Sequence, residues 1–175
     1  RATVAARVLL ERPSERRERD FVDAALRSRA LHRGFVAVPA TAAEYHDYLR
    51  RARRGNQESF LVVDSESHDL AGVVDVNDIK PGGEPSGRLG YYAFAPAAGT
   101  GLMREGVALV IDRAFRAFRL ARLDANVQPG NHRSLEFATR LGFTRDGSAR
   151  SYLKIGTRWR DHERWTLLAR DWQLR

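Results

Sequence analysis

The fold is decided by the stretch LGYYAFAPAAGTGLMRE, which runs from Leu89 to Glu105. Aromatic and apolar residues dominate positions 88–95 and predict a strand. Gly99 and Gly101 then interrupt the strand pattern and predict a turn. Beyond them the apolar residues change to helical spacing. The chain therefore passes here from a strand, through a glycine turn, into a helix.

The helix that follows this turn has the clearest apolar stripe in the sequence. Its apolar residues recur at intervals of three and four positions, which places them on one face of a helix. They are Val107, Val110, Ile111, Ala114, Phe115 and Phe118. The stripe predicts a helix that packs against a buried core.

The elements on both sides of this stretch predict a mixed α/β order. Strands 59–64 and 70–77 precede strand 88–95, with turn residues between them, and predict an antiparallel meander. Thr41 and Glu44 form a capping box that starts a helix. The remaining predicted elements are a strand over 4–10, a helix after Ser14, a strand over 123–127, a helix over 134–141, and strands over 149–155 and 163–169 joined by a turn over 156–161.

Length and composition bound the class of protein. The chain has 175 residues, of which 43% are hydrophobic and 30% charged, which is typical of one globular domain spanning residues 1–175. The absence of cysteine excludes disulfides, thiolate metal sites and a cysteine nucleophile. Apolar runs fall short of the roughly 20 residues that cross a bilayer, and no signal-like segment is seen. We therefore expect a cytoplasmic protein without a membrane partner.

The net charge of +8 favours acidic partners, but its distribution argues against a dedicated basic surface. Arginines are dispersed among acids rather than gathered in one block, which is also typical of a compositional bias. The segment from Trp159 to Trp165 mixes aromatic and basic residues and fits either RNA stacking or a half-buried hairpin. Its interleaved acids favour the hairpin, so no stable nucleic-acid binding is expected.

Two short motifs bear on chemistry. Gly99-Thr100-Gly101 precedes the strong helix, where free amides and the positive helix end suit a phosphate, although such turns are also simple connections. Asn131 and Ser134 open the predicted helix 134–141, where their ordinary role is capping. The sequence has no P-loop lysine, no G-x-G-x-x-G spacing, no G-x-S-x-G elbow and no histidine pair at metal-ligand spacing. The absence of these motifs argues against nucleotide hydrolysis, dinucleotide redox chemistry, hydrolase chemistry and a metal site.

Read together, four motifs resemble the GNAT superfamily of N-acetyltransferases, and within it the branch that acetylates the N-terminal alanine of ribosomal proteins. They occur in the family's order across about 80 residues. These motifs are Leu89-Gly90-Tyr91-Tyr92, Gly99-Thr100-Gly101-Leu102-Met103-Arg104-Glu105, Asn131-His132-Arg133-Ser134 with Leu141-Gly142-Phe143, and Trp159-Arg160-Asp161-His162 with Asp171-Trp172.

The resemblance implies the fold and the co-substrate. It implies a single α/β domain whose central sheet is mixed, mostly antiparallel, flanked by helices and splayed between its fourth and fifth strands. It also implies acetyl-CoA as co-substrate and no metal, with the pantetheine arm in the splay and the pyrophosphate on the glycine turn. The cofactor-binding residues implied are Ala93, Phe94, Ala95, Ala98, Gly99, Thr100, Gly101, Leu102, Met103, Asn131 and Ser134.

The resemblance also bears on the catalytic residues, Ser134, Tyr91 and Asp75. Ser134 stands in the N-x-x-S pattern, which implies that its hydroxyl returns a proton to the departing coenzyme A thiolate. Ala138 and Leu153 stand where other branches carry a tyrosine acid and a glutamate base, so neither role transfers. Asp75, Asn77 and Tyr91 lie on strands expected near the acceptor and are candidates for a proton relay through water, or ordinary strand polar groups.

The acceptor is left open between two classes of amine. A site without a strong base suits an N-terminal α-amine, whose pKa is near 8, better than a lysine, whose pKa is near 10.4. The first hypothesis is therefore acetylation of a protein N-terminus, plausibly ribosomal, by direct attack without a covalent enzyme intermediate. A small-molecule amine acceptor and a non-catalytic domain that binds coenzyme A or RNA are the alternatives. The sequence does not decide between a monomer and a homodimer.

Overall fold

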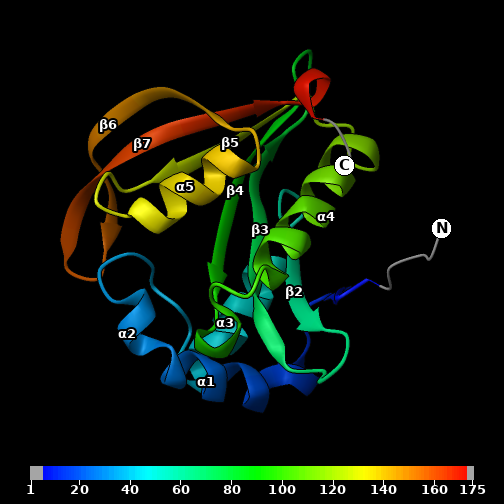
Figure 1. Cartoon of the computed structure of the whole chain (residues 1–175), viewed down its shortest axis with the longest axis vertical. Coiled ribbons are helices and arrows are strands. Elements are labelled where there is room, and N and C mark those ends of the chain that lie inside the picture. Colours follow the sequence, from blue (N-terminus) through cyan, green and yellow to red (C-terminus); the bar gives the residue numbers. More distant parts are fainter. Residues whose placement is uncertain (1–5, 173–175) are drawn as a thin grey trace.

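The computed structural model describes residues 6–172, which form a seven-stranded mixed sheet flanked by helices (Figure 1). The strand order is β1-β2-β3-β4-β5-β7-β6, and every neighbouring pair is antiparallel except β4 and β5, which are parallel. The strands are β1 Val8–Glu11, β2 Glu58–Asp64, β3 Leu70–Lys80, β4 Ser86–Ala93, β5 Arg122–Val127, β6 Thr144–Ile155 and β7 Arg158–Leu168.

Helices cover both faces of this sheet. The α-helices are α1 Glu18–Arg27, α2 Arg29–His32, α3 Ala42–Ala52, α4 Leu102–Arg116 and α5 His132–Arg140. Short 3₁₀ turns are Glu15–Arg17, Ala95–Ala97 and Ala169–Asp171. None of these described helices is long and apolar enough to cross a membrane.

Two hydrophobic clusters occupy the two faces, because successive strand residues point to opposite sides. Val74 and Val76 of β3 belong to the cluster under α4. Val73 of the same strand belongs to the cluster under α1 and α3, together with Phe21 and Tyr45. We name these two sides the α4/α5 face and the α1/α3 face. Both clusters consist of aromatic and aliphatic side chains that are almost fully buried.

Sequence periodicity placed most elements correctly. The meander of β2, β3 and β4 and the α4 stripe are confirmed, with Val107, Val110, Ile111 and Ala114 all buried. The capping box is confirmed with one change: Thr41 accepts from the Glu44 amide, but the Glu44 carboxylate accepts from the amide of Ala40 rather than that of Thr41.

Several element boundaries differ from those predicted. The first strand begins at Val8, and residues 4 and 5 of the predicted range lie outside the described part of the chain. β4 ends at Ala93, since Ala95 already belongs to a 3₁₀ turn. The last two strands are longer than predicted because only Gly156 and Thr157 form their turn, with Gly156 at φ +63°. Helix α2 was not predicted, since four residues give no readable periodicity.

Gly106 looks unfavourable in the sequence, since glycine within a helix costs about 0.5–1 kcal/mol relative to alanine. The structure explains why glycine occupies this position. A Cβ at this position would lie 2.6 Å from Cγ1 of Val62 on β2. The absence of a side chain therefore lets α4 approach the sheet closely.

Gly106→Ala is expected to destabilise the protein although alanine is the better helix former. Overpacking a buried site costs about 1–3 kcal/mol, which exceeds the gain in helix propensity. Denaturant unfolding measures the free energy change. Gly130→Ala is the matched control, because a Cβ there meets nothing within 4 Å. A Gly106→Ala protein as stable as the wild type would contradict the close-packing explanation.

The sheet splays between β4 and β5 as predicted. Their parallel register pairs Ser86 with Arg122 and ends where Leu89 pairs with Ala125. β4 then continues unpaired on that side to Ala93, and β5 continues to Val127. Gly90 is thus the first residue of β4 beyond the paired segment. Figure 1 shows α5 crossing near this separation.

Candidate active site

The turn before α4 has the geometry expected of a phosphate-binding loop. Gly99 and Gly101 have φ values of +77° and +87°, a conformation that side-chain-bearing residues rarely adopt. Thr100 fixes the turn, because its hydroxyl donates to the Ala97 carbonyl at 2.6 Å. Among residues 6–172, the amide N–H groups of Gly101 and Met103 have no recorded acceptor. They lie at the positive end of a 15-residue helix, which suits an anionic oxygen.

Arg7 supports this loop, a role that the sequence did not indicate. Its guanidinium donates to the Thr100 carbonyl at 3.1 Å, and its backbone amide donates to the Glu105 carboxylate at 2.9 Å. The chain just before β1 is therefore tied to the start of α4. A contact between residues nearly a hundred positions apart leaves no local pattern, so only the fold reveals it.

The segment expected to hold pantetheine has fewer free groups than predicted. The Phe94 amide donates to the Ala71 carbonyl at 2.8 Å, and the Ala95 amide donates to the Ser28 hydroxyl at 2.8 Å. The Phe94 side chain is fully buried among the aromatics of the α1/α3 face. Neither N–H is free in this conformation, so the amides of Phe94 and Ala95 do not match the expectation that they hold pantetheine.

His32 holds the end of β4 from the α1/α3 face. Its Nε2 lies 2.6 Å from the carbonyl oxygen of Ala93, and burial lowers its pKa, which favours a neutral ring that donates from Nε2. The ring also packs edge-on against Tyr92 and Phe94. His32 and Ser28 thus fix the backbone on both sides of Phe94.

His32→Leu is expected to reduce the free energy of unfolding by about 1–3 kcal/mol, because the Ala93 carbonyl loses its donor. His32→Gln, whose amide can still donate, should lose less. Urea unfolding of the two variants tests this, and equal losses would show that ring packing, not the hydrogen bond, is what matters.

On the α4/α5 face, two hydroxyls meet across the splay. The Tyr91 Oη lies 3.0 Å from Ser134 Oγ, and the Tyr91 ring packs 4.9 Å from that of Phe137. Asn131 caps α5 by accepting from the Ser134 amide at 3.3 Å. Burial raises the pKa of Tyr91 above its ordinary value, so its hydroxyl stays protonated. Three residues singled out in the sequence, Tyr91, Asn131 and Ser134, therefore form one cluster.

On the α1/α3 face, Asp75 lies opposite Gly90 in the β3–β4 register. The Tyr48 hydroxyl donates to its carboxylate at 3.0 Å. Burial raises the pKa of Asp75, although hydrogen bonds from Ser59 and Tyr48 and the charge of Arg51 act in the opposite direction. A carboxylate with a raised pKa is a better proton acceptor than an exposed one.

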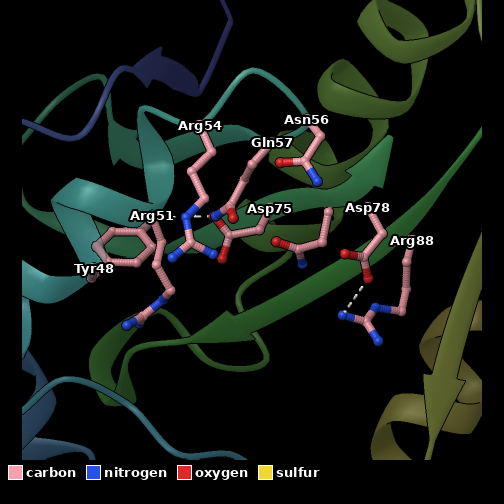
Figure 2. A pocket seen from close by; sticks show the side chains of 9 residues that line it. Tyr48, Arg51, Arg54, Asn56, Gln57, Asp75, Asp78 and Arg88 are labelled. Atoms are coloured by element: carbon pink, nitrogen blue, oxygen red, sulfur yellow. Dashed lines mark hydrogen bonds and ion pairs between the residues drawn. The ribbon is translucent and has the colours of Figure 1, made fainter. Parts of the chain in front are cut away.

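Asp75 borders a polar cavity of about 310 Å³ (Figure 2). The figure shows side chains from α3, the loop after it, β3 and β4 around the space, with an ion pair between Arg88 and Asp78. The lining residues are Tyr48, Arg51, Arg54, Asn56, Gln57, Asp75, Asn77, Asp78 and Arg88. Asn77 thus lines the same cavity as Asp75, as its place two positions along the strand requires.

The structure does not bring Asp75 and Ser134 together on one side. They lie on opposite faces of the sheet, at the point where β4 leaves β5. Ala138 is 1% exposed and packs in the core under α5, which leaves no room there for a tyrosine acid. Within residues 6–172, no group of three or more His, Asp or Glu side chains is placed to hold a metal ion.

This arrangement matches a known family. Residues 7–144 match the sequence pattern of the acetyltransferase (GNAT) domain, which covers most of the chain. The chain belongs to the GNAT family. It is accordingly an N-acetyltransferase, with the splayed sheet, glycine turn and N-x-x-S helix of that family.

Curated relatives support the same membership. The chain is 29% identical over 137 residues to a probable N-acetyltransferase, YjcK, of Bacillus subtilis, covering 78% of this chain and 76% of the relative. It is 32% identical over 120 residues to the [ribosomal protein uS5]-alanine N-acetyltransferase of Escherichia coli, covering 69% of this chain. That match spans 62% of the E. coli enzyme, less than two thirds of its length.

The fold also matches a solved GNAT structure. RimJ of Mycobacterium smegmatis, in complex with CoA-disulfide, superposes with a TM-score of 0.85 and 21% identity, covering 93% of this chain and 82% of that one. At this identity the likeness concerns the fold.

Proposed function

We propose that the protein transfers an acetyl group from acetyl-CoA to the N-terminal α-amine of a ribosomal protein. The observation that carries the proposal is the placement of proton-handling groups at the splay. A Tyr91–Ser134 hydroxyl pair lies on one face. The buried carboxylate of Asp75 lies on the other, on β3 opposite Gly90, which precedes Tyr91 in β4.

The two faces suit two halves of the same reaction. On the α4/α5 face, free amides of the glycine loop suit the pyrophosphate of acetyl-CoA, and Ser134 lies near the splay where the thioester would reach. On the α1/α3 face, Asp75 lies beside a polar cavity that can admit an amine. The M. smegmatis relative with this fold binds a form of coenzyme A, which supports the assignment of the first face.

The chemistry then needs no covalent enzyme intermediate. The amine nitrogen attacks the thioester carbonyl carbon, and Asp75 accepts the proton that the nitrogen loses, directly or through water. The carbon–sulfur bond breaks, and Ser134 donates a proton to the departing thiolate. Ser134 regains its proton from solvent, while Tyr91 stays protonated and holds the serine hydroxyl in place. Asp75 releases the proton it accepted to solvent, so both groups return to their starting state.

The acceptor assignment rests on electrostatics and on the E. coli relative, which is named for alanine of ribosomal protein uS5. The net charge of +8 disfavours a polycationic acceptor such as a polyamine, because like charges repel. A protein N-terminus, with an α-amine pKa near 8, is partly neutral at physiological pH and needs only a weak base.

Ser134→Ala is expected to lower kcat for acetyl transfer about 10- to 100-fold with little change in KM for acetyl-CoA. The serine hydroxyl acts on the leaving thiolate, an interaction made in the transition state, and the thiolate leaves readily enough to keep the loss moderate. Steady-state kinetics with a thiol-detecting assay measures both constants.

Thr139→Ala is the matched control, since Thr139 lies on the same helix and its hydroxyl donates to the Leu135 carbonyl, away from Tyr91. A Ser134→Ala enzyme with wild-type kcat would remove the serine from the mechanism.

A further inference from the structure

The cavity beside Asp75 has an excess of positive charge. Three guanidinium groups and two carboxylates line it, and Arg88 is already paired with Asp78 at 2.9 Å. Among the described residues, Arg51 and Arg54 make no ion pair within 4.0 Å of a carboxylate, whereas Arg50 of the same helix pairs with Asp47. The guanidinium groups of Arg51 and Arg54 are therefore available to an anion.

The remaining polar groups of the cavity suit the same kind of ligand. Asn56, Gln57 and Asn77 add side-chain amides, which can donate to an oxygen anion. Guanidinium groups match the planar, two-oxygen geometry of a carboxylate especially well. A volume of about 310 Å³ is at the small end of ligand cavities, enough for one or two amino-acid side chains.

Asp75 gives the cavity a direction. Its carboxylate, held by Tyr48 and opposite Gly90 at the splay, attracts an amine rather than an acid. Arg51 of α3 and Arg54 of the loop after it attract the opposite charge. A ligand with an amine and a carboxylate a short distance apart would satisfy both kinds of group at once.

We propose that this cavity selects the acceptor: it binds an acidic side chain close to the reacting amine, with Arg51 and Arg54 as the specificity-determining residues. The inference rests on the proposed function and names its substrate class as N-terminal segments with Asp or Glu at the second or third position. An extended chain advances about 3.3–3.6 Å per residue, so such side chains remain near the amine.

The test uses three peptides that begin with alanine and differ only at the second residue, which is Glu, Gln or Lys. We expect kcat/KM for the Glu peptide to exceed that for the Gln peptide about 5- to 50-fold, with the Lys peptide the poorest. Because Arg51 and Arg54 are proposed to bind the acidic side chain, the Glu-to-Gln ratio of kcat/KM should fall to near 1 in the double variant Arg51→Gln/Arg54→Gln.

The matched control is Arg50→Gln/Arg53→Gln, which removes the same two charges from neighbouring positions that do not line the cavity. It should keep the Glu-to-Gln ratio of the wild type, which separates a local contact from general steering by net charge. Arg51→Glu/Arg54→Glu should favour the Lys peptide over the Glu peptide.

The outcomes separate this inference from the function on which it rests. Equal rates on the Glu and Gln peptides, or a preference that survives in Arg51→Gln/Arg54→Gln, overturn the acidic-acceptor proposal while acetyl transfer to N-termini stands. Acetylation of none of the peptides by the wild-type enzyme would count against the proposed function itself.

Discussion

Asp75→Asn should lower kcat/KM for acetyl transfer about 10²- to 10⁴-fold, the range that a general base contributes. The substitution keeps the shape of the side chain, and its amide oxygen can still accept from the Tyr48 hydroxyl, so the fold around the cavity should be preserved. What is lost is the proposed proton acceptor on the α1/α3 face. Steady-state kinetics with a peptide acceptor measures the change.

The same variant is expected to be at least as stable as the wild type at neutral pH. Burial raises the pKa of Asp75 in the folded state, so the folded protein holds this proton more tightly than the unfolded chain. The stabilisation linked to the protonated group is complete below the ordinary carboxyl pKa of about 3.9 and is lost as pH rises through the raised value. Asparagine carries no charge and avoids this loss.

Thermal unfolding across pH therefore gives an independent check. The wild type should lose stability relative to Asp75→Asn as pH rises from about 4 towards neutrality. Tyr48→Phe is a companion variant for these unfolding measurements, because it removes one donor to the carboxylate and leaves the carboxylate itself.

In the kinetic experiment, an Asp75→Asn protein that keeps full activity would assign the base to another group.

Gly101→Glu should weaken acetyl-CoA binding about 10- to 1,000-fold. It places a carboxylate at the start of α4, where the pyrophosphate is proposed to lie, and two negative charges about 4 Å apart repel by about 1–4 kcal/mol. Isothermal titration with coenzyme A measures the affinity directly and does not depend on catalysis.

Gly101→Gln separates charge from backbone strain. Gly101 has φ +87°, so any side chain there is strained, and Glu and Gln share that strain. The Glu variant should bind coenzyme A about tenfold or more weakly than the Gln variant. Equal affinities for the two variants would mean that the anion does not bind at this loop.

Local patterns predicted the strands and the main helices because each long element repeats its signal many times, whereas the splay was implied by the family resemblance. The α4 stripe and the β2–β4 meander are examples. The pairing of Tyr91 with Ser134 also follows from the order of motifs, once the splay brings β4 beside α5. Helix α2, with four residues, was too short to give a periodic signal, and the turn that begins at Gly156 was predicted but is shorter than expected.

Contacts between distant segments account for most of what the sequence did not reveal. Arg7 supports the glycine loop, His32 holds the end of β4, and Tyr48 donates to Asp75, each from an element far away in the chain. The sequence suggested Asp75 but gave no reason for its basicity, which arises from burial in the folded state. The cavity arginines came from α3 and its loop, which looked like an ordinary charged helix end.

We propose that this GNAT enzyme acetylates protein N-termini by way of Asp75 and Ser134. The most direct test incubates wild type, Asp75→Asn and Ser134→Ala with acetyl-CoA, unacetylated ribosomal proteins and a panel of small amines, followed by mass spectrometry of every acceptor. We predict acetylation confined to protein α-amines by the wild type and a strong reduction in both variants. Acetylation of small amines alone, or no transfer to any acceptor, would contradict the account.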